Sequence, residues 1–197
     1  MKRTTMLASA MLLVGAVAVW QSQASGQTGA GWINLFDGKS LDKWEKIGDA
    51  NWRLEDGAVV ADKGNGHLVS KEDYTDFELR AEFWVDTAAN SGIFIRATNP
   101  AKVGTDSAYE VNIFDTRPEP AYGTGAIVNV AKVDPMPKAG NKWNVYEIVA
   151  KGPRFTVTLN GQRTVDGAED TKYSKGRISL QYGAGVVKFR KVDIKPL

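Results

Sequence analysis

The chain has 197 residues, with 25 Lys and Arg against 23 Asp and Glu, and 43% of its residues are hydrophobic. This near-balance of charge argues against a nucleic-acid partner, which requires a clustered basic surface, and the apolar content is sufficient for a buried core. The absence of Cys excludes disulfides, thiolate nucleophiles and Cys-ligated zinc, and a single His excludes sites that need two imidazoles. The 20 Gly and 6 Trp favour a turn-rich β protein.

Residues 1–24 have the pattern of a secretory signal peptide. Lys2 and Arg3 form a basic start, residues 6–20 are an apolar run that is short for a membrane span, and Ala24 ends a Ser-Gln-Ala cleavage pattern. The alternative is an uncleaved anchor. We therefore expect a secreted or periplasmic protein with no membrane contact after cleavage. Its expected parts are a signal peptide at 1–24, a linker at 25–31 and one domain at 32–197.

Beyond residue 31 the polarity pattern has the two-residue period of β-strands. Phe77–Val85 alternates strictly, with every second side chain apolar, which predicts a half-buried antiparallel strand. Asp56-Gly57 and Asn160-Gly161 predict tight hairpin turns within 52–61 and 154–165. The other predicted strands are 91–96, 109–114, 125–130, 145–150, 177–181 and 186–194. This pattern, without an amphipathic helix, predicts an all-β sandwich of two antiparallel sheets.

Strand alternation also predicts which side chains point away from the core. In strands 91–96, 109–114 and 177–181 the Ile, Val and Leu positions mark the core face. In 125–130 the pattern favours Ala126, Val128 and Val130 toward the core, and Ile127 and Asn129 outward. If these strands share one sheet, its other face collects polar side chains and two aromatic rings: Arg96, Glu110, Asn112, Asn129, Gln181, Phe94 and Phe114.

This outward set suits a small carbohydrate ligand. Aromatic rings pack against the C–H faces of a sugar, while amide, guanidinium and carboxylate groups bind its hydroxyls. The alternative is a solvated sheet face with an Arg–Glu surface pair. Two Pro-containing loops, 115–124 and 131–142, are long enough to be binding loops, although ordinary connections would have the same composition.

The remaining polar motifs predict no cofactor. His67 follows a Gly64-Asn-Gly turn, and both a surface residue and a catalytic base remain open for it. The Gly-rich turns lack the following helix that a phosphate site needs. A divalent metal on the long loops is conceivable but unsupported, because their acidic residues Asp115, Glu119 and Asp134 lack the spacing of a calcium loop.

A series of short motifs runs in a fixed order through the chain after the predicted linker. They are Leu35-Phe-Asp-Gly-Lys-Ser-Leu41 with Trp44, Trp52-Arg-Leu-Glu-Asp-Gly57, His67-Leu-Val-Ser70, Asp76-Phe-Glu-Leu79, Asn90-Ser-Gly-Ile-Phe-Ile-Arg96, Tyr109-Glu-Val-Asn-Ile113, Thr124-Gly-Ala126, Trp143-Asn144, Leu159-Asn-Gly161 and Gly176-Arg-Ile-Ser-Leu-Gln181. In this order the chain resembles the bacterial 3-keto-disaccharide hydrolase domains, formerly a domain of unknown function. The resemblance implies a concanavalin A-like jelly-roll sandwich whose concave sheet carries the site.

The resemblance also implies a hydrolase that acts on glycosides oxidised at C3 of the sugar. A ketone at C3 acidifies the C2 proton, so a base can remove it, the C1 substituent can leave, and water can add back. By position, Glu110 would be the base or an orienting carboxylate, and Arg96 would hold the developing oxyanion. His67 is a third candidate for catalysis. The candidates for substrate binding are Asn112, Gln181, Asn129, Phe94, Phe114 and Tyr182.

The chain departs from the family pattern in the last motif. Many members carry Leu-Gln-Asp-His-Gly where this chain has Leu180-Gln-Tyr-Gly-Ala. A role of that His as acid, base or metal ligand would have to pass to Tyr182 or His67. The expected function is a secreted hydrolase or lyase of 3-keto-glycosides. The alternatives are a noncatalytic carbohydrate-binding module and a structural sandwich with a protein partner, and the oligomeric state stays open.

Overall fold

The computed structural model describes residues 30–197. The predicted signal peptide, and the predicted linker except its last two residues, lie outside this range. Within it the chain forms two antiparallel sheets and one short 3-10 helix, which confirms the all-β prediction. No helix of residues 30–197 is long and apolar enough to cross a membrane.

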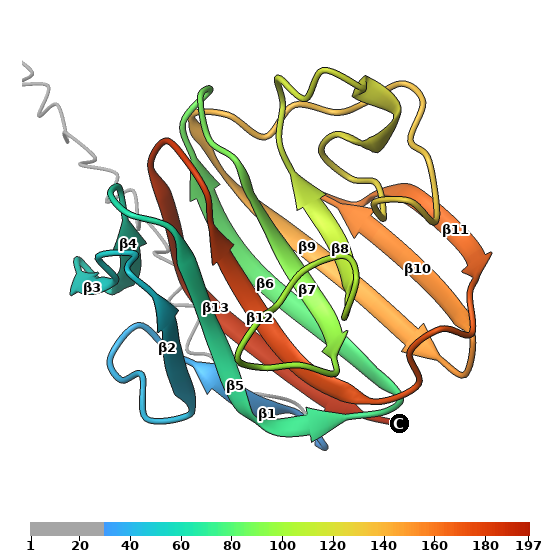
Figure 1. Ribbon diagram of the computed structural model, residues 1–197, viewed down its shortest axis with the longest axis horizontal. Helices are drawn as coiled ribbons and strands as arrows, with labels where there is room; N and C mark the ends of the chain where they lie inside the picture. Colours follow the sequence, from blue (N-terminus) through green and yellow to red (C-terminus); the bar gives the residue numbers. More distant parts are fainter. Residues whose placement is uncertain (1–29) are drawn as a thin grey trace, which may run out of the picture.

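The strands divide into an eight-stranded and a five-stranded sheet (Figure 1). The larger sheet has the order β11-β10-β9-β6-β13-β4-β3, with β1 paired to β13, and the smaller has the order β2-β5-β12-β7-β8. The elements are β1 Ile33–Phe36, β2 Trp44–Gly48, β3 Arg53–Glu55, β4 Ala58–Ala61, β5 Gly66–Tyr74, β6 Phe77–Val85, β7 Ser91–Ala97, β8 Tyr109–Ile113, η1 Pro120–Tyr122, β9 Lys142–Lys151, β10 Arg154–Leu159, β11 Gln162–Glu169, β12 Gly176–Tyr182 and β13 Val187–Pro196.

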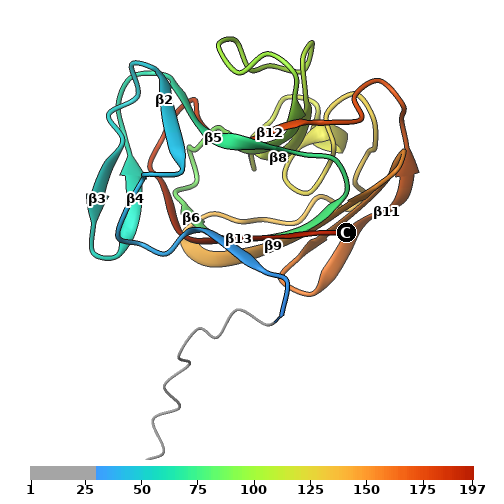
Figure 2. The ribbon, with the colours of Figure 1, turned by 90° about the horizontal axis from the view of Figure 1, so that it is seen from below.

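The two sheets lie face to face and enclose one continuous hydrophobic core (Figure 2). Aromatic rings from the larger sheet fill its centre, where Phe83 stacks on Tyr146 with ring centroids 5.0 Å apart. The predicted core faces of β7, β8 and β12 are confirmed, because the cluster contains Ile93, Ile95, Val111, Ile113, Ile178 and Leu180. Since alternate residues of a strand face opposite sides, this fixes the other face of the five-stranded sheet.

The structure differs from the sequence prediction in three strands that had not been predicted and in one predicted strand that does not form. β1, β2 and β5 had not been predicted, and β5 places His67 within a strand that begins at the end of the predicted Gly64-Asn-Gly turn. The predicted strand 125–130 is wrong, because the chain pairs with β8 only through an isolated bridge between Val111 and Ile127. Ile127 lies in the core, contrary to its predicted outward place, whereas Val130 packs against the core and Asn129 is exposed, as predicted. The chain then turns at Asn129, whose φ is 63°.

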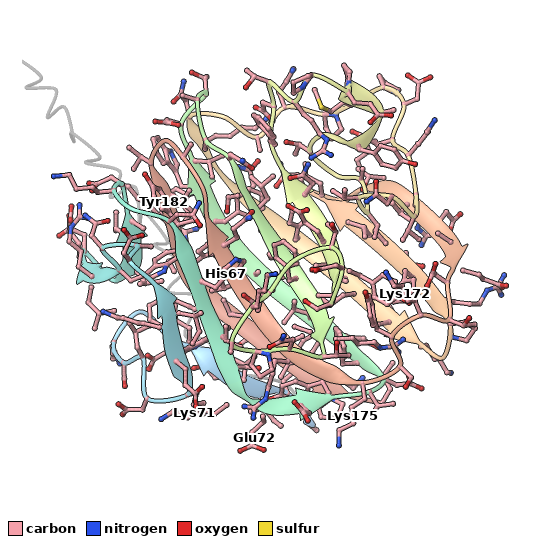
Figure 3. The ribbon with its side chains drawn as sticks, viewed as in Figure 1. His67, Lys71, Glu72, Lys172, Lys175 and Tyr182 are labelled. Atoms are coloured by element: carbon pink, nitrogen blue, oxygen red, sulfur yellow. The ribbon has the colours of Figure 1, made fainter. Side chains whose placement is uncertain are left out.

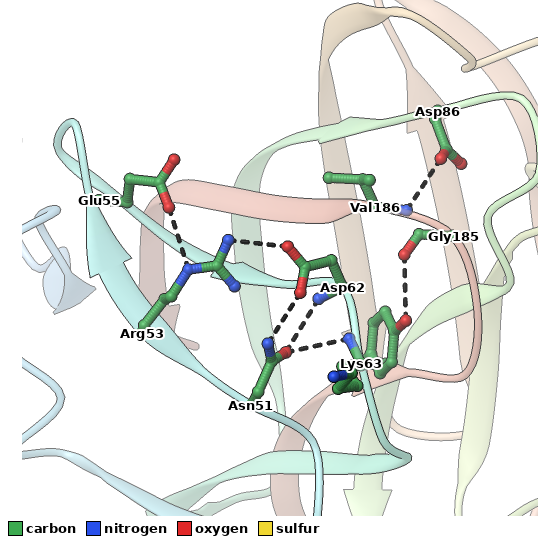
Figure 4. A network of polar contacts seen from close by, with 9 residues as sticks. Asn51, Arg53, Glu55, Asp62, Lys63, Asp86, Gly185 and Val186 are labelled. Atoms are coloured by element: carbon green, nitrogen blue, oxygen red, sulfur yellow. Dashed lines mark hydrogen bonds and ion pairs between the residues drawn. The ribbon is translucent and has the colours of Figure 1, made fainter.

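The β3–β4 hairpin at the edge of the larger sheet is held by polar contacts around Arg53 (Figure 4). The Arg53 guanidinium contacts Glu55 at 3.0 Å and Asp62 at 2.8 Å. The Asn51 side-chain oxygen accepts the backbone N–H groups of Asp62 and Lys63, each at 3.0 Å. This hairpin is therefore fixed by exposed ion pairs as well as by its strand pairing, and it lies outside the five-stranded sheet.

Candidate functional site

The outer face of the five-stranded sheet, away from the core, gathers most of the predicted site residues. His67 on β5 pairs with Gln181 on β12, and Phe94 on β7 pairs with both Ser179 and Glu110. Paired residues of neighbouring strands lie on the same face of a sheet. Figure 3 shows His67 over the middle of this sheet. We define the outer-face site by His67, Phe94, Glu110, Asn112, Ser179 and Gln181.

Glu110 is a buried carboxyl without a protein partner. Its residue is 8% exposed, and it makes no hydrogen bond or ion pair with the described residues through its carboxylate. Gly92 gives it room, because a Cβ at this position would lie 3.1 Å from both Cγ and Oε1 of Glu110. Burial raises the pKa of Glu110 to about 7, against a smaller opposing effect of Arg117. A carboxyl that titrates near neutral pH is suited to general base catalysis.

Glu110→Gln is expected to stabilise the protein at neutral and alkaline pH. A carboxyl whose pKa is raised by folding stabilises the fold when protonated, and this contribution is lost as the pH rises from the ordinary value of 4.5 through about 7. The Gln amide does not ionise. The free energy of unfolding of the variant, relative to that of the wild type, should therefore be higher at about pH 9 than at about pH 4, by up to about 3 kcal/mol. Urea unfolding at both pH values measures this gain. If the difference in free energy of unfolding between variant and wild type were the same at both pH values, this would contradict the buried position of Glu110.

His67 is a neutral imidazole packed beside Glu110's neighbour Phe94. The two rings meet edge-on, with centroids 5.3 Å apart and an interplanar angle of 73°. His67 Nδ1 lies 2.9 Å from Ser179 Oγ. His67 is only 9% exposed, and burial lowers its pKa to about 4. At neutral pH His67 can therefore take part in hydrogen bonds without carrying a charge.

Two buried amide oxygens of the site have no partner among residues 30–197. These are Asn112 Oδ1 and Gln181 Oε1. The fully buried Asn112 side chain is held on its other side, where Nδ2 donates to the Tyr122 carbonyl at 2.7 Å. Buried polar atoms are almost always hydrogen-bonded, and leaving one unpaired costs about 1–3 kcal/mol. The two oxygens are therefore candidates for contact with hydroxyl groups of a ligand.

The opposite sheet and the long loops hold Asn112 in place. The Tyr146 hydroxyl donates to the Asn112 carbonyl at 2.6 Å and accepts the Gly125 N–H at 2.8 Å. The Asp115 carboxylate joins the two long loops, since it accepts the Thr124 hydroxyl at 2.7 Å and backbone N–H groups of Ala139 and Gly140. Its oxygens are thus engaged in loop structure. Within the described range no group of three or more His, Asp and Glu side chains is placed to hold a metal.

The predicted place of Arg96 on the outer face is wrong. Its φ of 54° interrupts the alternation of β7, and its guanidinium lies at one end of the sandwich with the residue 1% exposed. There it donates to the carbonyls of Thr75, Gly152 and Tyr173 and forms an ion pair with Asp76 at 3.0 Å. All of its directional contacts join chain connections, so Arg96 is part of the structural framework.

Two predicted aromatic contacts to substrate are also wrong. Phe94 is on the outer face but is 2% exposed, because the β7–β8 loop folds over it and packs Val103 and Ala108 against it. Figure 1 shows this loop crossing in front of β7 and β12. Tyr182 belongs to the core, where its ring meets Trp52 edge-on at 6.3 Å. Its hydroxyl donates to the Gly185 carbonyl at 3.0 Å.

The last two predicted binding residues lie at the margin of the site. Asn129 is exposed at the turn that follows the Val111–Ile127 bridge, so the structure does not bring it to the outer-face site. Phe114 is half-buried and comes directly after β8, at the end where Asn112 lies. The structure thus brings together Glu110, Asn112, Gln181 and His67 from the predicted set, and adds Ser179 and the small Gly92.

Comparisons with known proteins agree with this architecture. The family model of the 3-keto-alpha-glucoside-1,2-lyase-like domain matches residues 31–195. A 3-keto-disaccharide hydrolase of Bacteroides thetaiotaomicron is 31% identical over 113 residues, covering 46% of this chain and 39% of that protein. The match therefore spans less than half of the relative's length.

Solved structures show the same sandwich. An inferred glycosyl hydrolase from Parabacteroides distasonis has a TM-score of 0.75 at 19% identity, covering 85% of this chain and 94% of that chain. The carbohydrate-binding module CBM66 from Bacillus subtilis has a TM-score of 0.60 at 17% identity, covering 78% and 95%. These likenesses confirm the concanavalin A-like jelly-roll fold. With the family model matching nearly the whole described chain, the protein belongs to the family of 3-keto-alpha-glucoside-1,2-lyase-like domains.

Proposed function

We propose that this chain is a secreted or periplasmic enzyme that cleaves 3-keto-glycosides at the outer-face site, with Glu110 as the general base. The observation that carries the proposal is the Glu110 carboxyl, which is buried, unpartnered and has a pKa of about 7. Family membership and the name of the Bacteroides relative support the substrate class. The expected signal peptide at 1–24 supports export. The ligand is a small carbohydrate, and no cofactor is proposed.

The proposed reaction is an elimination followed by addition of water. The Glu110 carboxylate takes the C2 proton of the sugar, and the electron pair forms the C1–C2 double bond as the C1–O bond breaks. The protonated Glu110 then gives its proton to the departing oxygen. In the second half Glu110 takes a proton from water, whose oxygen bonds to C1, and returns a proton to C2. One carboxyl thus serves both halves, without the second carboxylate of ordinary glycosidases.

Neutral groups of the site stabilise the enolate in this proposal. Since Arg96 is engaged at the end of the sandwich, it does not take the role first assigned to it. If the Ser179 hydroxyl donates to His67 Nδ1, Nε2 carries the ring proton and can donate to the C3 oxygen as charge develops. The Asn112 and Gln181 oxygens accept sugar hydroxyls. With these roles, Glu110 is the one residue of the outer-face site that gains and loses a proton during the proposed reaction.

The test compares two substrates that differ only at C3. The chain without residues 1–24 is incubated with a 3-keto-disaccharide and with the same disaccharide before oxidation. The proposal expects release of the free sugars from the 3-keto substrate alone, because only the ketone acidifies C2. Cleavage of both substrates at similar rates, or of neither, would overturn the proposed function.

The pH dependence of activity should follow Glu110. A general base must be ionised, so kcat/KM should rise with pH and level off above a pKa of about 7. His67 adds no change in this range, since it is already neutral above a pKa of about 4. Initial rates between about pH 5 and pH 9 measure the profile. A rate that falls as the pH rises through 7 would require a protonated catalytic group instead.

A noncatalytic carbohydrate-binding module is the second candidate. It is favoured by the core position of Tyr182, which cannot replace the His that many family members carry in the last motif. It is also favoured by the likeness to a carbohydrate-binding module in fold. This reading expects saturable binding of 3-keto and unoxidised sugars without release of product. Calorimetric titration beside the activity assay separates the two candidates.

A further inference from the structure

The outer face of the five-stranded sheet is closed at one end and half-exposed at the other. Toward the closed end lie Phe94, Ser179 and Val69, all buried, and the β7–β8 loop packs over Phe94. Toward the other end the exposure increases, and Gln181 and residues 183–186 are half-buried. A ligand that reaches Glu110 must therefore extend toward the half-exposed end.

Asn90 lies at this half-exposed end and on the same face. It precedes the outer-face residue Gly92 by two positions, which in a strand places both on one side. Its backbone is fixed to the end of β12, because its carbonyl accepts the N–H groups of Gly183 at 2.9 Å and Ala184 at 3.1 Å, and its own N–H donates to the Ala184 carbonyl at 3.1 Å. The position of Asn90 is therefore set by rigid pairing.

Gly183 leaves room for the Asn90 side chain. A Cβ at position 183 would lie 3.3 Å from both Cγ and Nδ2 of Asn90 and 3.0 Å from its carbonyl oxygen. The amide thus fills the space beside Gln181 that a larger residue would take. Within residues 30–197 the amide makes no hydrogen bond of its own, although the backbone around it is fully paired. Phe114 lies at the same end of the sheet. It follows Ile113, which pairs with Ser91, and Ser91 is the residue after Asn90.

We infer that Asn90 binds the part of the glycoside that lies beyond the oxidised sugar, with Phe114 as its apolar neighbour. This inference rests on the proposed function, since it takes the oxidised ring to lie over Glu110. A second sugar unit presents hydroxyls to the Asn90 amide and a C–H face to the Phe114 ring. A methyl aglycone presents neither. The chain should therefore prefer a 3-keto-disaccharide to a methyl 3-keto-glucoside.

The experiment measures kcat and KM of Asn90→Ala on both substrates. Loss of one neutral hydrogen bond should raise KM for the disaccharide about 5–10-fold and leave the methyl glucoside within about twofold. Gly183→Ala, which displaces the Asn90 amide, should show the same selective loss. Asn99→Ala is the matched control, because it is the same substitution at an exposed Asn of the β7–β8 loop, at the closed end of the sheet, and it should change kcat and KM for neither substrate. Thermal unfolding of each variant checks that the fold is kept.

The outcomes separate this inference from the proposed function. Turnover by the wild type with equal loss on both substrates in Asn90→Ala overturns the role of Asn90 and keeps the proposed function. Absence of turnover overturns the proposed function, and the same two ligands are then compared by calorimetric binding. Selective weakening of disaccharide binding in Asn90→Ala supports the inference. Equal weakening, or no preference of the wild type for the disaccharide, overturns it.

Discussion

Glu110→Gln should lower kcat on a 3-keto-glycoside by about 10²–10⁴-fold, the usual contribution of a positioned general base. The amide keeps the shape of the side chain but cannot accept the C2 proton. Because the wild-type carboxyl has no protein partner, its removal leaves no hydrogen bond unmade. The variant should therefore fold at least as well as the wild type and still bind substrate. Steady-state kinetics and urea unfolding of the same preparation measure both effects.

The matched control is Glu147→Gln on the opposite sheet. Glu147 lies on β9, is half-exposed, and forms an exposed ion pair with Arg80 at 3.1 Å. It is the same substitution at a position far from the outer-face site in the fold, and kcat should stay within about twofold, since exposed pairs contribute little. Equal kcat for Glu110→Gln and the control would mean that Glu110 does not act as the base.

Arg96→Ala should destabilise the protein by about 3–5 kcal/mol, the cost of removing one partner of a buried charged network. The substitution leaves the carbonyls of Thr75, Gly152 and Tyr173 without their donor and Asp76 without its cation. It also removes the guanidinium that packs 5.3 Å from the centre of the Phe155 ring. These contacts join the turns before β6, after β9 and before β12, so their loss should loosen one whole end of the sandwich.

Arg80→Ala is the control for this prediction. Its side chain is 57% exposed and paired with Glu147, so the expected cost is about 0–1 kcal/mol. The difference in free energy of unfolding between the two variants, measured in urea, decides the role of Arg96. If Arg96→Ala proved as stable as Arg80→Ala while losing all activity, the original assignment of Arg96 to the active site would be correct.

Local alternation was sufficient to predict three of the four strands that build the site, β7, β8 and β12, and their core faces. β6 was predicted with its observed bounds, and the apolar positions of β7, β8 and β12 were placed in the core. Glu110, Asn112 and Gln181 follow from that assignment, since each lies between two core residues in sequence. β5 was missed because its polar second half, Lys71 to Asp73, hides the period.

The errors in the predicted site residues have three different causes. Arg96 was misplaced because a left-handed backbone residue breaks the two-residue period, and only Gly adopts this conformation readily. Phe94 was placed on the correct face, but burial by the β7–β8 loop depends on tertiary packing. Tyr182 follows the outward Gln181 and so faces the core, as strict alternation of β12 would have indicated. The contact between Asn90 and Gly183 joins residues far apart in sequence.

Turnover of a 3-keto-disaccharide in D₂O, stopped early and followed by NMR of the released 3-keto sugar, tests the central claim most directly. If Glu110 removes the C2 proton and water later supplies a new one, the released sugar must carry deuterium at C2 from the first turnovers. A sample of the free 3-keto sugar in the same buffer corrects for exchange without enzyme. Product that keeps its original C2 hydrogen would contradict the elimination route and the role of Glu110 as its base.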